Sequence, residues 1–121
     1  MLIHEFCSIK RNDLQGEFDY AIIKNRDRVL VSDKIILWNI DFIDFKSKNS
    51  ESHPAFTTHW QYIGDKHLGL DYHGISVILN EDLDSFIQVL EKYRKRRCIK
   101  KLRTLCIKAK TDHEDIVHCG I

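Results

Sequence analysis

The chain has 121 residues, of which 43% are hydrophobic and 31% charged, and its formal net charge is +1. This composition is typical of one globular domain with its own core, and it argues against a disordered chain or a small disulfide-dependent scaffold. No apolar run approaches the roughly 18 residues of a membrane-spanning helix, and the N-terminal sequence lacks the features of a secretory signal. We therefore expect a cytoplasmic protein without a membrane partner, and we expect its four cysteines to be reduced thiols.

The near-neutral total hides an uneven distribution of charge. Residues 1–91 carry 9 Lys/Arg and 15 Asp/Glu, whereas residues 92–121 carry 10 Lys/Arg and 3 Asp/Glu. The sequence therefore predicts a mildly acidic body with a basic C-terminal part. Such an asymmetry bears on the choice of partners more than on the fold.

The first half of the chain reads as strands. Residues 2–9 are expected to form the first strand, and residues 17–24 alternate between apolar and polar side chains, which is typical of a half-buried strand. In this second strand, Phe18, Tyr20 and Ile22 share one face, and Glu17 and Asp19 share the other.

Further strands are expected over residues 29–31 and 33–46, the longer of which places Asp41 on its polar face. Its apolar face would hold Ile36, Trp38, Ile40 and Phe42. After a polar loop, residues 57–64 alternate again, with Thr58, Trp60 and Tyr62 inward and His59 and Gln61 outward.

Two alternating sets follow with opposite parity. Residues 68–72 present every second residue inward and leave Asp71 outward, whereas residues 75–79 follow the opposite phase. A tight turn or bulge at His73 and Gly74 is needed to reset the pleat.

Helical structure is expected from Asn80, a good N-cap residue followed by acidic side chains that suit a helix N-terminus. One apolar stripe at helical spacing consists of Leu83, Phe86, Ile87 and Leu90, and a second consists of Cys98, Ile99, Leu102, Leu105, Cys106 and Ala109. An unbroken helix over residues 81–109 would be roughly 43 Å long, so we expect a break near residues 94–97, where like charges crowd.

This order of elements predicts an α+β fold: an antiparallel sheet of about five or six strands with the C-terminal helix or helices packed on one face. Residues 1–121 are expected to form a single domain, mainly β over 1–79, helical over 80–110 and with a tail over 111–121. The sheet face away from the helices would be exposed to solvent and would gather acidic side chains.

Seven histidines invite a catalytic or metal-binding interpretation, but their spacings match no metal-binding or catalytic motif. His113 and His118 match half of a zinc-finger pattern, whereas Cys98 and Cys106 are too far apart for its other half. Both cysteines fall on the apolar stripe, which favours buried thiols. We expect no metal, no cofactor and no catalysis, with a small histidine-dependent hydrolase as an alternative.

The basic run over residues 92–103 allows three interpretations. Its cations could neutralise nucleic-acid phosphates or rest on an anionic membrane surface. They alternate with Cys98, Ile99 and Leu102, however, which favours the solvated outer face of a packed helix. Tyr93 is the only aromatic residue in the run, which argues against binding of single strands.

Residues 72–93 resemble a strand-to-helix pattern of small bacterial immunity proteins from contact-dependent growth inhibition and other polymorphic toxin systems. The strand part of the pattern is matched by Tyr72, Gly74, Ile75, Val77 and Ile78, and the helix part by Leu83, Phe86, Val89 and Leu90. The resemblance implies a protein without catalysis that binds the C-terminal domain of a cognate toxin, often a nuclease, and blocks its active site.

The sequence thus leads to a hypothesis of a toxin-neutralising binding protein. Its expected contact surface is the outward acidic face of the sheet, formed by Glu17, Asp19, Asp41, His59 and Asp71. Charge complementarity of this kind speeds and orients association. A nucleic-acid-binding module that uses residues 92–103 is the other alternative.

Overall fold

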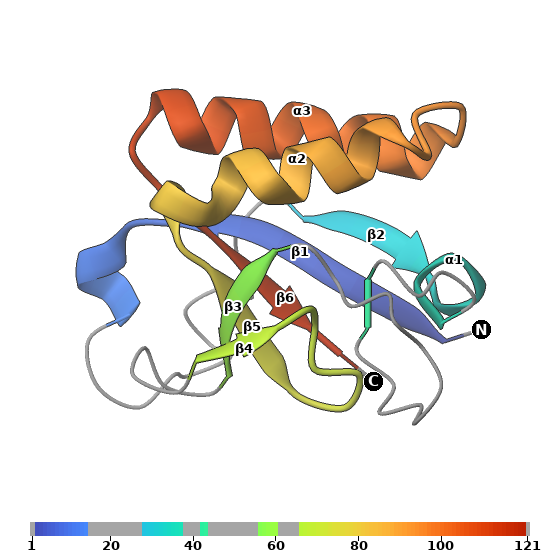
Figure 1. The fold of residues 1–121 in the computed structure, drawn as a ribbon, viewed down its shortest axis with the longest axis horizontal. Helices are drawn as coiled ribbons and strands as arrows, with labels where there is room; N and C mark the ends of the chain where they lie inside the picture. Colours follow the sequence, from blue (N-terminus) through green and yellow to red (C-terminus); the bar gives the residue numbers. More distant parts are fainter. Residues whose placement is uncertain (1, 15–27, 38–41, 44–55, 61–65, 121) are drawn as a thin grey trace.

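The computed structural model describes residues 2–14, 28–37, 42–43, 56–60 and 66–120. Within them, six strands form one antiparallel sheet in the order β2-β1-β6-β5-β3-β4 (Figure 1). The strands are β1 (Ile3–Ile9), β2 (Val29–Ser32), β3 (Thr57–Trp60), β4 (Lys66–Leu68), β5 (Ile75–Ile78) and β6 (Asp115–Cys119).

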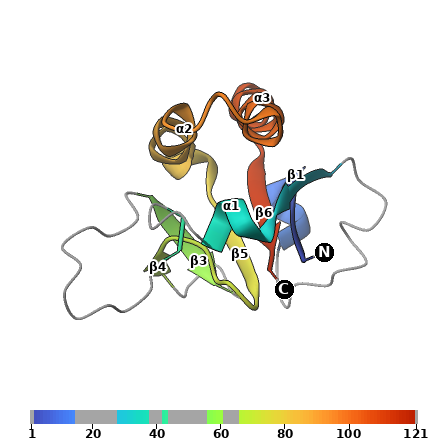
Figure 2. The ribbon, with the colours of Figure 1, turned by 90° about the vertical axis from the view of Figure 1, so that its right-hand side faces the viewer.

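Two helices, α2 (Leu83–Glu91) and α3 (Arg97–Thr111), lie side by side over one face of this sheet, as the end-on view in Figure 2 shows. The short elements are α1 (Asp33–Leu37) and the 3-10 helices η1 (Arg11–Leu14) and η3 (Asn80–Asp82). The predicted α+β fold, with an antiparallel sheet and helices on one face, is confirmed.

The helices form where the apolar stripes of the sequence predict them. The buried side chains recur every three or four residues, so that each helix presents one apolar face to the sheet. They are Leu83, Phe86, Val89 and Leu90 in α2 and Ile99, Leu102, Cys106 and Ala109 in α3. The expected break is also confirmed, because residues 92–96 separate the two helices.

The C-terminal segment differs most from its prediction. Residues 115–119 were expected in a tail, but they form β6, which pairs with β1 on one side and with β5 on the other. All five residues of β6 are buried. The expectation of a tail is therefore wrong, because the sequence DIVHC has apolar side chains on both faces, as a strand in the middle of a sheet requires.

The sheet has buried apolar side chains on both faces. Phe6, Ile78 and Ile116 belong to the main core under the helices, which also contains Phe86 and Leu102. A second cluster faces the other way and consists of Cys7, Ile9, Val77, Val117 and Cys119, none of which is more than 7% exposed. The expectation of an exposed polar face is therefore wrong for the centre of the sheet.

Two other predictions can be compared with the described residues. The predicted turn at His73 and Gly74 is confirmed, since these residues directly precede β5. The inward set predicted before this turn is wrong at Leu68, which is 45% exposed at the end of β4. The long strand over 33–46 is wrong in its first part, which forms α1. The run of apolar residues there suits a helix as well as a strand, and the helix buries Ile36 fully. The predicted strand 17–24 lies outside the described residues.

Gly120 allows the chain to pass closely over the turn before β5. Its N–H donates to the carbonyl oxygen of Gly74 at 2.7 Å. A Cβ atom at Gly120 would lie 2.3 Å from the carbonyl oxygen of Tyr72. Because the obstructing atoms are backbone, no side-chain rotation relieves the clash.

We therefore expect Gly120→Ala to lower the free energy of unfolding by about 1–3 kcal/mol, as overpacking does elsewhere. Chemical denaturation followed by circular dichroism measures this. Thr104→Ala is the control, because Thr104 is exposed and its hydroxyl bonds only within its own helix. Equal stability of the Gly120→Ala variant and the wild-type protein would contradict the close approach.

Candidate functional site

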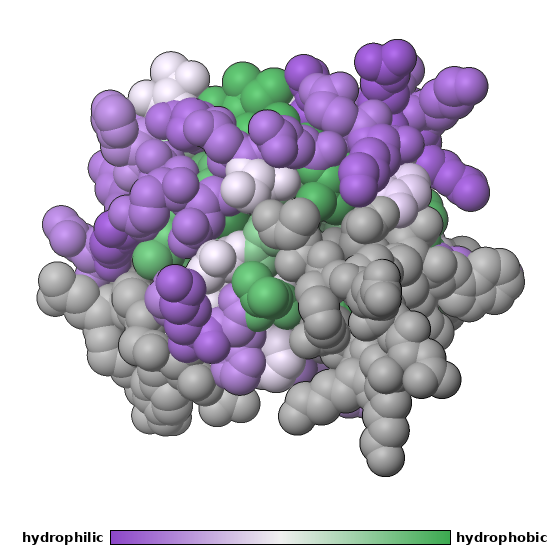
Figure 3. Space-filling view, in the orientation of Figure 1, coloured by the Kyte–Doolittle hydropathy of each residue, from purple (hydrophilic) through white to green (hydrophobic). Residues whose placement is uncertain are grey.

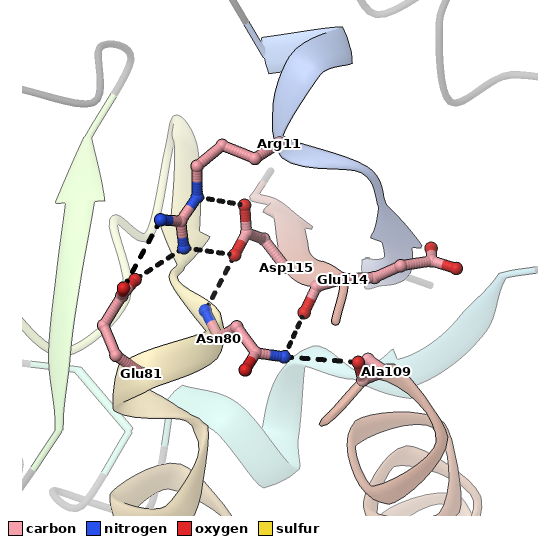
Figure 4. Close-up of polar contacts among 6 residues, drawn as sticks. All are labelled: Arg11, Asn80, Glu81, Ala109, Glu114 and Asp115. Atoms are coloured by element: carbon pink, nitrogen blue, oxygen red, sulfur yellow. Dashed lines mark hydrogen bonds and ion pairs between the residues drawn. The ribbon is translucent and has the colours of Figure 1, made fainter. Parts of the chain in front are cut away.

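A buried carboxylate at the start of β6 is bonded by two distant parts of the chain (Figure 4). Asp115 is 1% exposed. The guanidinium group of Arg11 donates to both of its carboxylate oxygens, from Nε at 3.1 Å and from Nη2 at 2.9 Å. The N–H of Asn80 donates to Oδ1 at 2.7 Å. A bidentate arginine and a backbone donor together compensate for the burial of this charge.

The same arginine also reaches the exposed Glu81, whose pKa it lowers by hydrogen bonding. Asn80 was expected to cap a helix, but no side-chain cap bond forms at the start of η3. The side-chain amide nitrogen of Asn80 instead donates to the carbonyl oxygens of Ala109 and Glu114. We call Arg11, Asn80, Glu81 and Asp115 the clasp, which ties η1 and η3 to the end of α3 and the start of β6.

A second polar cluster lies at the other end of β6 and includes Asp33 of α1. His4 Nε2 lies 3.1 Å from Oδ1 of Asp33, and His4 Nδ1 lies 2.8 Å from Nε2 of His118. His118 Nδ1 lies 3.2 Å from the hydroxyl oxygen of Ser76, which accepts the N–H of Asp71 at 2.7 Å. We call Asp33, His4, His118 and Ser76 the relay.

The relay has one consistent arrangement of protons when both histidines are neutral and Asp33 is ionised. His4 Nε2–H then donates to Asp33, so His4 Nδ1 is an acceptor and His118 Nε2–H must donate to it. His118 Nδ1 therefore accepts the hydroxyl proton of Ser76. Every bond in the chain has one donor and one acceptor, so no buried polar atom along it is left unpaired.

Burial holds these histidines neutral. The side chains of His4, His118 and Ser76 are 0% exposed. Burial lowers the pKa of His118 well below its usual 6.5, and the neighbouring His4 adds to this effect. Burial also lowers the pKa of His4, although its hydrogen bond to Asp33 opposes the shift. The residue types are those of a hydrolase, but a substrate has no access to the serine.

The sequence did not point to the clasp or the relay as groups. Their members come from segments up to 114 residues apart, and no short motif contains them. One signal was present for His118, which follows Ile116 and Val117 in an apolar run that a strand interpretation would have placed in the sheet.

Of the five residues predicted to form the contact surface, Glu17, Asp19 and Asp41 lie outside the described residues. His59 lies in β3 opposite Val77, and its Nδ1 is buried without a hydrogen-bond partner among the described residues. Asp71 lies in the turn before β5, where its carboxylate accepts the N–H of His73 at 3.3 Å. It therefore stabilises a turn.

The cysteine and metal predictions can also be compared with the structure. All four cysteines are free thiols, as predicted, and burial raises the pKa of Cys119 to about 12. Cys106 is buried and Cys98 half-buried. In the described part of the chain, His, Cys, Asp and Glu side chains nowhere form a group of three that could hold a metal ion. None of the described helices is long and apolar enough to cross a bilayer.

Among the described residues, the densest run of exposed charged side chains surrounds the connection from α2 to α3. Hydrophilic side chains gather over this connection in the space-filling view (Figure 3). Six exposed cations belong to it, and we call them the basic end: Arg94, Lys95, Arg96, Arg97, Lys100 and Lys101. Within the ranges described above, none of the six forms an ion pair, whereas Arg103 pairs with Glu91.

Two hollows flank the first turns of α3. One has a volume of about 560 Å³ and is lined by Glu91, Arg94, Lys95, Lys100, Arg103 and Thr104. The other has a volume of about 540 Å³ and is lined by Arg28, Val29, Leu30, Arg97, Cys98 and Lys101. The first lining is polar throughout, whereas the second combines cations with apolar side chains.

Comparison of the chain with protein-family models, with curated proteins and with solved structures found no match. The clasp and the relay are built into the fold, and among the surfaces described above the basic end is the one most suited to a partner.

We expect Arg11→Gln to lower the free energy of unfolding by about 2 kcal/mol, because it removes two of the bonds to a buried carboxylate. This loss of stability is smaller than is usual for a buried ion pair. Arg11 is 45% exposed, so water can replace part of the lost hydrogen bonding. Glu81→Gln, which removes the exposed partner of the same arginine, should change stability by less than about 0.5 kcal/mol. Urea denaturation of both variants measures the difference, and equal losses would contradict the role of Asp115.

The relay predicts how stability depends on pH. Because the pKa values of His4 and His118 are lower in the folded state, the unfolded chain takes up protons first as the pH falls. The stabilisation of the fold by these two histidines is therefore present above about pH 6.5. Below that pH the free energy of unfolding falls by up to about 1.4 kcal/mol per pH unit for each histidine that stays neutral.

Denaturation midpoints between pH 7.5 and pH 5 should show this loss. His118→Gln removes one of the two histidines, so its stability should fall less steeply below pH 6.5 than that of the wild-type protein, while its stability at pH 7.5 is lower. An identical pH dependence in both proteins would show that His118 does not stay neutral in the folded state.

Proposed function

We propose that the protein is an immunity protein that binds a cognate toxin domain and neutralises it by covering its active site. The observation that carries this proposal is the exposed basic end, whose cations form no ion pair with the residues that the structure describes, above a sheet whose centre is buried on both faces. Such a body offers a rigid, charged surface for docking and requires no chemistry of its own.

The segment with the immunity-protein resemblance supports this proposal. Residues 72–93 run through β5, η3 and α2, in the strand-to-helix order that the resemblance implies. Six of its nine matched residues are at most 3% exposed: Val77, Ile78, Leu83, Phe86, Val89 and Leu90. These residues therefore build the scaffold, and recognition of the toxin falls to residues outside this pattern.

The relay is the observation that most favours an enzyme, and its burial argues against one. A nucleophilic serine must meet its substrate, but Ser76 has no exposed surface and its oxygen already accepts the N–H of Asp71. A general base must also exchange protons with the substrate. His118 is instead enclosed between Ser76 and His4, so a structural role suits it better.

Co-expression tests the proposal. The C-terminal domain encoded by the gene beside this one should arrest the growth of a bacterial host when it is expressed alone. Co-expression of this protein should restore growth, and the two chains should elute together from a size-exclusion column, because inhibition requires a stable complex.

A toxin from an unrelated pair is the control, and it should remain lethal in the presence of this protein. An adjacent domain that stays lethal, and that elutes separately in a catalytically inactive form, would contradict the proposed function. A genomic neighbourhood without a toxin domain would contradict it as well.

A further inference from the structure

We infer that the toxin domain docks on the basic end and on the hollow beside β2, and that it presents an acidic surface with an apolar side chain at its centre. This inference rests on the proposed function above. It assigns the contact to α3 and β2, instead of to the outward face of the sheet.

The first argument is the state of the cations. The six side chains of the basic end crowd into residues 94–101, and within the part of the chain that the structure describes none is neutralised by a carboxylate. Like charges held together repel one another, and an acidic partner removes this repulsion while it gains favourable pairs. The positive N-terminal end of the α3 helix dipole also favours an acidic partner.

The second argument is the apolar part of the hollow beside β2. Leu30 is 48% exposed, and it lies with Val29 and Cys98 in one lining. Arg28 is held at this place by Glu5, at 2.8 Å. Arg97 and Lys101 complete the rim. An apolar centre surrounded by charged groups is the usual composition of a protein-protein contact.

These features favour an acidic protein surface over a nucleic acid. Phosphates gain nothing from Leu30, whereas an apolar side chain of a protein would bury it. The aromatic residue of this region, Tyr93, is half-buried and packs on Phe42 at a ring distance of 5.4 Å, so it offers no exposed platform for bases.

Charge reversal tests the surface. In Lys95→Glu/Arg96→Glu/Lys101→Glu, three cations of the basic end become acidic. The variant should fold, because acidic side chains near the N-terminus of α3 suit the helix dipole. The probe is the toxin domain encoded beside this gene, inactivated at its catalytic residue. We expect its affinity for the variant to fall on the order of 100-fold, with a weaker dependence on salt.

The matched control is Lys10→Glu/Lys66→Glu/Lys108→Glu, which changes the net charge by the same amount at exposed positions away from the basic end. It should keep its affinity within about 3-fold. A loss of the same size in the control would overturn the inference, because the effect would then follow net charge. Undiminished binding by the basic-end variant would also overturn it, and the proposed function would stand.

The apolar part has its own pair of variants. Leu30→Ser should weaken binding about 10-fold or more, whereas Leu68→Ser, at a residue 45% exposed on the opposite edge of the sheet, should not. Equal losses of affinity in the two variants would overturn the assignment of the hollow beside β2 to the contact surface.

A short DNA duplex tests the other class of partner. At physiological salt we expect it to bind the wild-type protein far more weakly than the inactive toxin domain does. Duplex binding as tight as toxin binding, and abolished by the charge reversal, would overturn the inference about the partner. If the toxin domain does not bind the wild-type protein at all, the proposed function itself fails.

Discussion

The burial of two polar side chains in β6 is the constraint on which the rest of the structure depends. Asp115 and His118 lie in the middle of the sheet, where an unpaired charge or ring nitrogen would destabilise the fold by several kcal/mol. Their partners, Arg11 and His4, come from the first strand and the helical turn after it. Strands near both ends of the chain are therefore held in one sheet, and the helices pack on its apolar face.

This arrangement separates stability from recognition. The histidines of the relay, His4 and His118, have no exposed surface. Six exposed cations gather where α2 turns into α3, and their apolar neighbours Ile99 and Leu102 anchor that turn to the core. A partner can therefore meet a strongly charged surface without disturbing the sheet. The proposed neutralisation of a toxin requires this combination, because an inhibitor must keep its shape while it covers an active site.

Patterns with a clear period could be predicted from the sequence, and contacts between distant segments could not. The helices and their break follow from apolar spacing and crowded charges, and the turn at His73 and Gly74 follows from a change of parity. The strand of residues 115–119 was missed because a strand with apolar side chains on both faces shows no alternation. The relay was missed for a related reason, since pairing β6 with β1 is what brings His118 to His4. The basic run was recognised, but sequence spacing could not show which of its cations lack a partner.

Hydrogen-deuterium exchange of the protein alone and bound to the inactive toxin domain tests the central claim most directly, because it reports on the whole surface at once. The claim is that the partner covers the end of the helical layer and the edge strand β2, while the buried centre of the sheet takes no part. The expected result is new protection of amides over residues 92–103 and 28–31, with β6 unchanged because it is already protected in the free protein. Protection confined to other segments, or rapid exchange of β6 in the free protein, would contradict this account.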